Sequence, residues 1–131
     1  MKTLLVVDAN PIISALIGGS SREIFFSKTY RFATAEYTVE EVRGFIPYIA
    51  EKSGVAEEEI EKALGLLPLK VYSREDYRDK ITESERIIKG IDEKDLDILA
   101  LALKLKAPIW TNDRHFENIR EVRVVKTQDL I

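Results

Sequence analysis

The chain has 131 residues, of which 45% are hydrophobic and 33% charged, and its formal net charge is −3. This composition predicts one globular domain over residues 1–131 and excludes a disordered or fibrous chain. No apolar run approaches the roughly 18 residues of a membrane span and no secretory leader is seen, so we expect a cytoplasmic protein without membrane contact. The lack of cysteine and the single His115 exclude thiolate and histidine-rich metal sites, so oxygen must hold any metal.

The chain opens with a predicted strand, two helices and a second strand. Residues 3–7, TLLVV, form a continuous apolar run that is typical of a parallel strand buried on both faces. Asp8 follows at the expected carboxyl end of this strand. Pro11 suits the first turn of a helix that Asn10 would cap, and a glycine pair ends it. A second short helix then leads to a strand near residues 31–35.

The next predicted helix carries two adjacent glutamates. Thr38 is expected to cap it, with Glu41 in the position that completes a capping box. On the helical wheel Glu41 borders the apolar stripe, whereas Glu40 points away from it. Glu41 is therefore the glutamate that can face a site, although closing the capping box explains it equally well. Pro47 should kink this helix.

Three further elements follow, and none of them suggests chemistry. Residues 54–66 predict an amphipathic helix, residues 67–72 a strand, and residues 74–89 a charged helix.

The following helix carries a carboxylate on its apolar side. Asp95 projects into the middle of the face formed by Ile98, Leu99, Ala102 and Leu105. An ionised carboxylate there needs a cation or hydrogen-bond donors as partners. Asp97 is expected on the polar face beside Lys104, in contact with solvent. Asp92 is expected to cap the start of the helix.

A polar triplet follows the next predicted strand, residues 107–110. Thr111, Asn112 and Asp113 end this strand, and ligands of open α/β sheets collect outside the carboxyl ends of strands. Asp113 has a second explanation as the cap of a turn. A last strand at residues 122–125 and a helical turn complete the chain.

Strands that alternate with helices predict a parallel sheet with helices on both faces. Asp8 and Asp113 would then lie at one edge of the sheet, within reach of Glu41 and Asp95 from flanking helices. Carboxylates brought that close repel one another unless they are protonated or share a hard cation such as Mg²⁺ or Mn²⁺. The sequence therefore predicts an oxygen-ligated metal site.

Four segments together resemble the PIN-domain family, and the resemblance covers essentially the whole chain. They are VVDAN at 6–10, TVEEV at 38–42, DEKDLDILALALKL at 92–105 and APIWTNDRHF at 107–116. The last two are the specific ones. The resemblance implies a three-layer α/β/α fold with a central, mainly parallel sheet. It also implies a ribonuclease that depends on Mg²⁺ or Mn²⁺, in many members the toxin of a toxin–antitoxin pair and a homodimer.

The family's site residues transfer by position. The acids that bind metal and perform catalysis fall on Asp8, Glu41, Asp95 and Asp113, and Asp92 matches an additional acid of many members. Three polar residues are expected to orient these carboxylates, namely Asn10, Thr111 and Asn112. Two cations next to the acids are expected to contact the phosphates of RNA, namely Arg114 and Lys94.

Two other functions use a similar fold. A non-catalytic PIN-like scaffold that binds a partner would explain the fold but not the inward-facing Asp95. A phosphoacceptor domain resembles the predicted site, yet it needs an acid pair after the first strand and a lysine after a later one, and VVDAN and WTNDRHF supply neither.

Overall fold

The computed structural model describes residues 2–89, 92 and 94–131, in which every strand pairing is parallel. The strands of these residues are β1 (Thr3–Val7), β2 (Tyr30–Ala35), β3 (Leu69–Tyr72), β4 (Ile109–Trp110) and β5 (Val124–Val125). They form one sheet in the order β3-β2-β1-β4-β5. Val6 of the central strand lies beside Ala33 on one side and Ile109 on the other. The predicted parallel sheet is confirmed.

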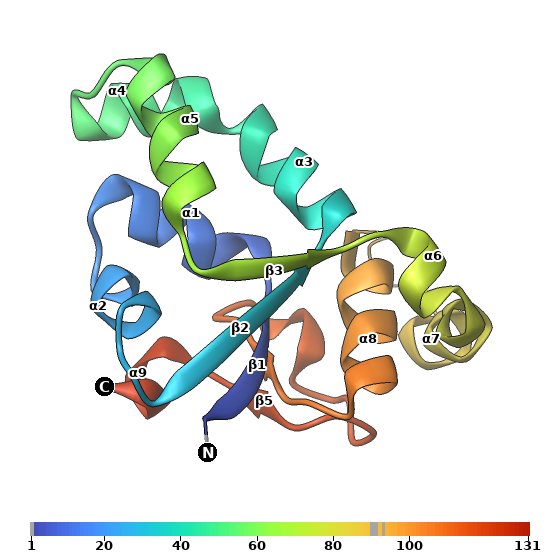
Figure 1. Cartoon of the computed structure of the whole chain (residues 1–131). Coiled ribbons are helices and arrows are strands. Elements are labelled where there is room, and N and C mark those ends of the chain that lie inside the picture. The colour runs from blue at the N-terminus through green and yellow to red at the C-terminus, as the bar shows by residue number, and fades with distance from the viewer. Residues whose placement is uncertain (1, 90–91, 93) are drawn as a thin grey trace.

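Helices cover both faces of this sheet (Figure 1). The α-helices of the described residues are α1 (Ala9–Ile17), α2 (Ser21–Phe25), α3 (Glu36–Gly44), α4 (Ile46–Ser53), α5 (Glu57–Leu66), α6 (Arg74–Tyr77), α7 (Ile81–Ile88), α8 (Lys94–Leu105) and α9 (Thr127–Leu130). Helices α1, α2, α4 and α5 pack on one face, and α6, α7 and α8 on the other. The three-layer α/β/α fold is therefore confirmed. No helix within the described residues is long and apolar enough to cross a membrane.

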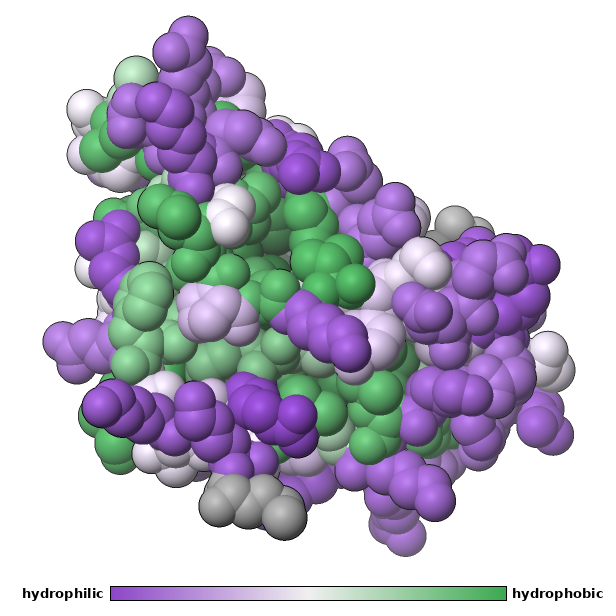
Figure 2. All heavy atoms as spheres, viewed as in Figure 1, coloured by the Kyte–Doolittle hydropathy of each residue, from purple (hydrophilic) through white to green (hydrophobic). Residues whose placement is uncertain are grey.

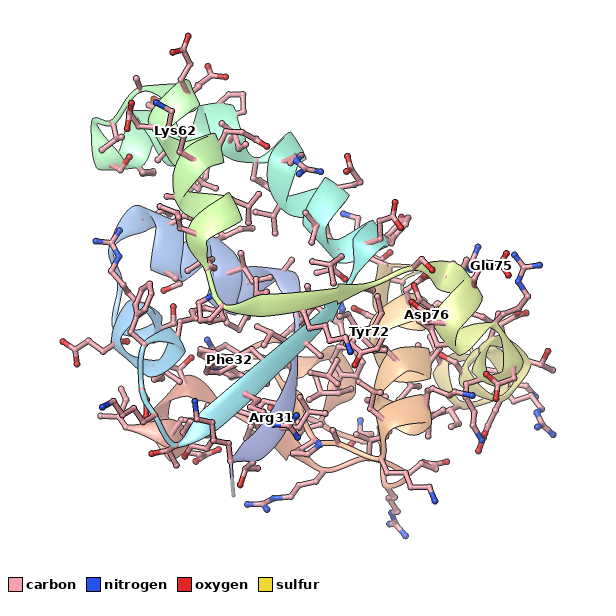
Figure 3. All side chains as sticks on the ribbon, in the orientation of Figure 1. Arg31, Phe32, Lys62, Tyr72, Glu75 and Asp76 are labelled. Atoms are coloured by element: carbon pink, nitrogen blue, oxygen red, sulfur yellow. The ribbon has the colours of Figure 1, made fainter. Side chains whose placement is uncertain are left out.

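The central strand supplies both halves of the core because its side chains alternate between the faces. Leu5 and Val7 belong to the cluster beneath α1, and Val6 belongs to the cluster beneath α8. On the α1 side Phe32 of β2, whose position is labelled in Figure 3, meets Phe25 and Trp110 at centroid distances of 4.9 and 5.8 Å. The apolar run at residues 3–7 is continuous because helices cover both faces of the sheet at this strand.

Two helix starts differ from the expected ones. Asp8, and not Asn10, caps α1, and its carboxylate accepts a hydrogen bond from the N–H of Ala9. Helix α3 begins at Glu36 directly after β2, so Thr38 lies inside the helix and does not cap it. The capping box expected for Glu41 is therefore wrong, because the strand runs into the helix without an intervening turn.

The expected kink at Pro47 is a full break between helices. Helix α3 ends at Gly44 and α4 begins at Ile46, with Pro47 in its first turn and Phe45 between the two. Proline has no N–H to continue a helix but fits a first turn well. The single helix expected over residues 74–89 is also wrong, because a 3-10 turn, η1 (Arg78–Lys80), separates α6 from α7.

The edge strand β3 is partly exposed. Figure 2 shows apolar surface gathered over this side of the molecule, whereas hydrophilic side chains cover α6 and α7. Val71 of β3 is 48% exposed, and Lys70 beside it carries a charge. A lysine on an edge strand disfavours pairing with another sheet.

Candidate functional site

Five carboxylates line one cavity at the carboxyl edge of the sheet. They are Asp8, Glu41, Asp92, Asp95 and Asp113. The cavity has a volume of about 250 Å³. The structure therefore brings together the acids that the sequence placed at strand ends and on flanking helices.

Asp8 is held rigidly at the end of β1. One carboxylate oxygen accepts from the N–H of Ala9 at 2.8 Å, and the other accepts from the hydroxyl of Thr111 at 2.8 Å. Burial raises the pKa of Asp8, and these two hydrogen bonds oppose the increase. Asp8 is thus an oriented carboxylate whose charge the protein alone compensates only in part.

Thr111 connects the two strand ends that carry Asp8 and Asp113. Its hydroxyl donates to Asp8 and accepts from the backbone N–H of Asp113 at 3.0 Å and from Asn10 Nδ2 at 3.4 Å. The side chain of Asn112 bonds to Thr127 instead, and its backbone N–H donates to Asn10. Thr111 therefore orients a carboxylate directly, whereas Asn112 stabilises the loop.

Asp95 lies in the first turn of α8 and is 5% exposed. Burial and, after it, the neighbouring charge of Asp8 together raise its pKa to about 6, and His115 opposes the increase. Nδ1 of His115 lies 2.9 Å from Asp95 Oδ2, where a protonated Nδ1 donates to the carboxylate. The compensating partner that Asp95 required is thus at least in part a histidine.

His115 is the site residue that the sequence interpretation missed. Its Nδ1 lies 3.4 Å from Asp113 Oδ2 as well as beside Asp95. Burial lowers the pKa of His115, but the hydrogen bond to Asp95 and the nearby acids outweigh this and raise it. Its position two residues after Asp113 was the available signal, because Asp113 caps the 3-10 turn η2 (Arg114–Phe116) and thereby turns His115 back toward the acids.

Glu41 faces the cavity from α3, and its neighbour does not. Burial, followed by the charges of Asp8 and Asp95, raises the pKa of Glu41 to about 7, and Lys94 opposes the increase. Glu40 is exposed and forms an ion pair with Arg43. The helical-wheel preference for Glu41 as the inward glutamate is confirmed.

The two expected cations are placed differently. Lys94 lines the cavity, whereas Arg114 is exposed and lies outside the cavity lining. Asp92 lines the cavity and also accepts from the backbone N–H of Lys94 at 3.1 Å, as expected of a cap. Of the two, Lys94 alone faces the carboxylates.

Asp97 contradicts the expectation that it is a solvated surface residue. It is 3% exposed, accepts a hydrogen bond from Tyr77 Oη and lies 3.5 Å from Arg74 Nε. Lys104 pairs with Asp79 instead. Burial and the hydrogen bond to Asp97 raise the pKa of Tyr77. The prediction failed because α6 packs over the side of α8 that a helical wheel shows as polar.

A family-level comparison matches residues 6–128 to the PIN domain. The chain belongs to the PIN domain family. Among solved structures, it is similar to VapBC2 from Rickettsia felis bound to a promoter DNA fragment, with 17% identity and a TM-score of 0.68 over 95% of this chain and 98% of that one. It is also similar to VapBC from Salmonella typhimurium bound to DNA, with 24% identity and a TM-score of 0.66 over 97% and 99% of the two chains. A toxin–antitoxin complex from Klebsiella pneumoniae is similar at 19% identity and a TM-score of 0.69, over 94% and 97%. At these identities the likeness concerns the fold. No curated protein matches the chain.

The donor set of this PIN domain fits a hard divalent cation. Carboxylate oxygens are the ligands that Mg²⁺ and Mn²⁺ prefer. Without a bound cation, repulsion from the neighbouring carboxylates helps to raise the pKa of Glu41 to about 7. Within residues 2–89, 92 and 94–131, no three acidic or histidine side chains already stand in metal-ligand geometry.

Proposed function

We propose that this PIN domain is a metal-dependent endoribonuclease that hydrolyses RNA phosphodiester bonds. The supporting observation is the meeting of Asp8, Glu41, Asp95 and Asp113 at one cavity, where burial and mutual charge raise the pKa of Glu41 to about 7. A cluster of strongly perturbed acids in a cleft is typical of a functional site. These four residues would hold Mg²⁺ or Mn²⁺, with Asp92 as an additional acid.

The chain's own groups would prepare the site for this reaction. Thr111 and the N–H of Ala9 hold the Asp8 carboxylate in one orientation, and Asn10 in turn supports Thr111. His115 stabilises the charged form of Asp95. Lys94 faces the cavity, where its ammonium group would contact a phosphate of the substrate. A bound divalent ion would supply Lewis acidity that activates water and stabilises the leaving oxygen.

The biological assignment is the toxin of a toxin–antitoxin pair. The fold is shared over nearly the whole chain with VapBC structures and with a toxin–antitoxin complex from Klebsiella pneumoniae. A second protein, the antitoxin, would then bind this chain, and the nuclease would act as a homodimer.

One observation favours a second candidate, a non-catalytic PIN scaffold. His115 lies within hydrogen-bond distance of Asp95, so a partner other than a metal compensates the buried carboxylate. In a scaffold this contact would be structural, and Asp95→Asn would destabilise the fold with or without metal. In a nuclease the same substitution removes a metal ligand and relieves repulsion from Asp8.

A cleavage assay combined with thermal melts separates the two candidates. Purified wild-type protein should cleave RNA with Mn²⁺ but not with EDTA, and Asp95→Asn should lose about 100-fold or more of this activity. Asp79→Asn, at an exposed ion pair with Lys104, serves as the control and should stay active. At pH 8 in EDTA, Asp95→Asn should melt at or above the wild-type temperature. The nuclease proposal is overturned if the melting temperature of Asp95→Asn is lower than that of wild type and does not respond to metal. It is also overturned if wild-type protein cleaves no RNA with either Mg²⁺ or Mn²⁺.

A further inference from the structure

An exposed aromatic side chain, Phe45, stands at the rim of the acidic cavity, and a second one, Tyr48, packs against it. Phe45 lines the cavity and is 41% exposed, and Tyr48 is 47% exposed. Their rings lie edge to face, with centroids 6.5 Å apart and an angle of 76° between the planes. An exposed aromatic pair beside a charged cavity is a candidate surface for a ligand.

The break between α3 and α4 creates this arrangement. Phe45 follows Glu41 by four residues at the end of α3, so the two lie on one side of this helix. The chain leaves α3 at Phe45 because Pro47 lies in the first turn of the next helix. Ile13 of α1 lines the same cavity. The cavity thus has an apolar wall, Ile13 and Phe45, beside its carboxylates.

Lys94 stands beside this wall, and a second lysine, Lys52, packs on the ring of Tyr48. Lys94 lines the cavity and is close enough to Glu41 to lower its pKa. Nζ of Lys52 lies 5.8 Å from the ring centroid of Tyr48. Both lysines are exposed residues, so their ammonium groups remain available to an anionic ligand.

We propose that Phe45, with Tyr48 packed against it, is the wall on which a nucleobase of the substrate stacks. The adjoining phosphate would then lie toward Lys94, and Lys52 beside Tyr48 would be a second cation for the backbone. This assignment rests on the proposed nuclease function and adds to it the residues that bind a base. Unpaired bases stack on aromatic side chains with little dependence on sequence, and flanking cations contact the backbone.

Charge and extent favour a nucleobase over a protein segment. The apolar members of the cavity lining are Ala9, Ile13 and Phe45, which is far less than the continuous patch of a protein interface. The same lining places one cation, Lys94, beside the apolar wall, and this combination suits a base with its adjoining phosphate. If the experiment below shows that Phe45 does not contact RNA, a protein segment becomes the alternative ligand of this wall.

The experiment uses two substitutions at Phe45 and the same two at Phe26. Phe26 is 62% exposed at the end of α2 and lies outside the cavity lining. Phe45→Leu keeps apolar bulk but removes the ring, and Phe45→Trp keeps a ring and adds an exposed fluorophore, whereas the natural Trp110 is buried. The probes are oligoadenylate and oligouridylate of equal length, with Ca²⁺ in place of Mn²⁺ for binding and Mn²⁺ for cleavage.

Phe45→Leu should weaken binding of oligoadenylate by between about fivefold and a hundredfold and should raise KM more than it lowers kcat. Phe26→Leu should stay within about twofold of wild type. Oligoadenylate should quench the fluorescence of Phe45→Trp and leave that of Phe26→Trp unchanged. Thermal melts verify that each variant is folded.

The outcomes distinguish this assignment from the proposed function. If wild type cleaves RNA while Phe45→Leu binds and cleaves equally well and Phe45→Trp is not quenched, the base-stacking wall is refuted and the nuclease stands. The wall would then serve another ligand, such as a protein segment. If RNA quenches Phe45→Trp but wild type cleaves nothing, the wall is supported and the nuclease fails.

Discussion

Replacing Glu41 by glutamine in the metal-free protein should stabilise it at pH 8. The pKa of Glu41 is raised from 4.5 to about 7, first by burial and then by the charges of Asp8 and other acids. A folded-state pKa above the unfolded value means that the folded chain binds more protons between the two values. Stability therefore falls as the pH rises from about 4.5 to about 7 and stays low above that range.

The size of the effect follows from the two pKa values. Their difference is equivalent to about 3.4 kcal/mol, and screening at the partly exposed Glu41 reduces this to about 1.5 kcal/mol. For a chain of 131 residues this corresponds to an increase of about 5 °C in Tm. The gain should disappear near pH 5, where Glu41 is protonated in the folded wild type and carries no charge to relieve.

Glu40→Gln is the matched control, because Glu40 is adjacent, exposed and paired with Arg43. Calorimetric melts of wild type and both variants at pH 5 and pH 8 in EDTA test the expectation. Glu40→Gln should stay within about 0.5 kcal/mol of wild type at both values. A Glu41→Gln variant that is destabilised at pH 8, or that gains equally at pH 5, refutes the view of Glu41 as a strained acid of the site.

Three further predictions concern Asp97, His115 and the metal. Asp97→Asn should lower the free energy of unfolding by about 1–3 kcal/mol, because it weakens the buried contacts with Tyr77 and Arg74; urea unfolding measures this, and a neutral effect would show that the buried charge is not needed. The pKa of His115 is raised in the folded chain, so its stabilising contribution is complete below pH 6.5 and lost as the pH rises through the folded value. His115→Ala should accordingly lower the free energy of unfolding more at pH 6.5 than at pH 9. An equal decrease at both pH values would contradict a stabilising ion pair between His115 and Asp95. Mn²⁺ at about a hundred times its Kd should stabilise wild type by about 2.7 kcal/mol, so a melting curve unchanged by millimolar Mn²⁺ would argue against a metal site.

Much of this fold could be predicted because it is encoded in short-range patterns. The apolar run at residues 3–7 predicted a strand buried on both faces, and β1 has this position at the centre of the sheet. Strand and helix alternation then required parallel pairing, since each crossover passes through a helix. Parallel strands end at one edge, so the convergence of Asp8 and Asp113 followed from sequence order alone.

Helical periodicity also placed two of the acids correctly. A rotation of 100° per residue fixes which side chains share a face of a helix. It therefore predicted that Glu41 and not Glu40 faces inward, and that Asp95 lies on the buried side of its helix. These inferences needed only the element's own residues.

The tertiary structure alone decided contacts between elements. Asp97 is buried because α6 brings Tyr77 and Arg74 onto its side of α8, and no periodicity within α8 contains that information. His115 reaches Asp95 across 20 residues of chain because the turn capped by Asp113 directs it there. A helical wheel measures how one helix divides apolar from polar residues, whereas the burial of a polar residue depends on which neighbour packs against it.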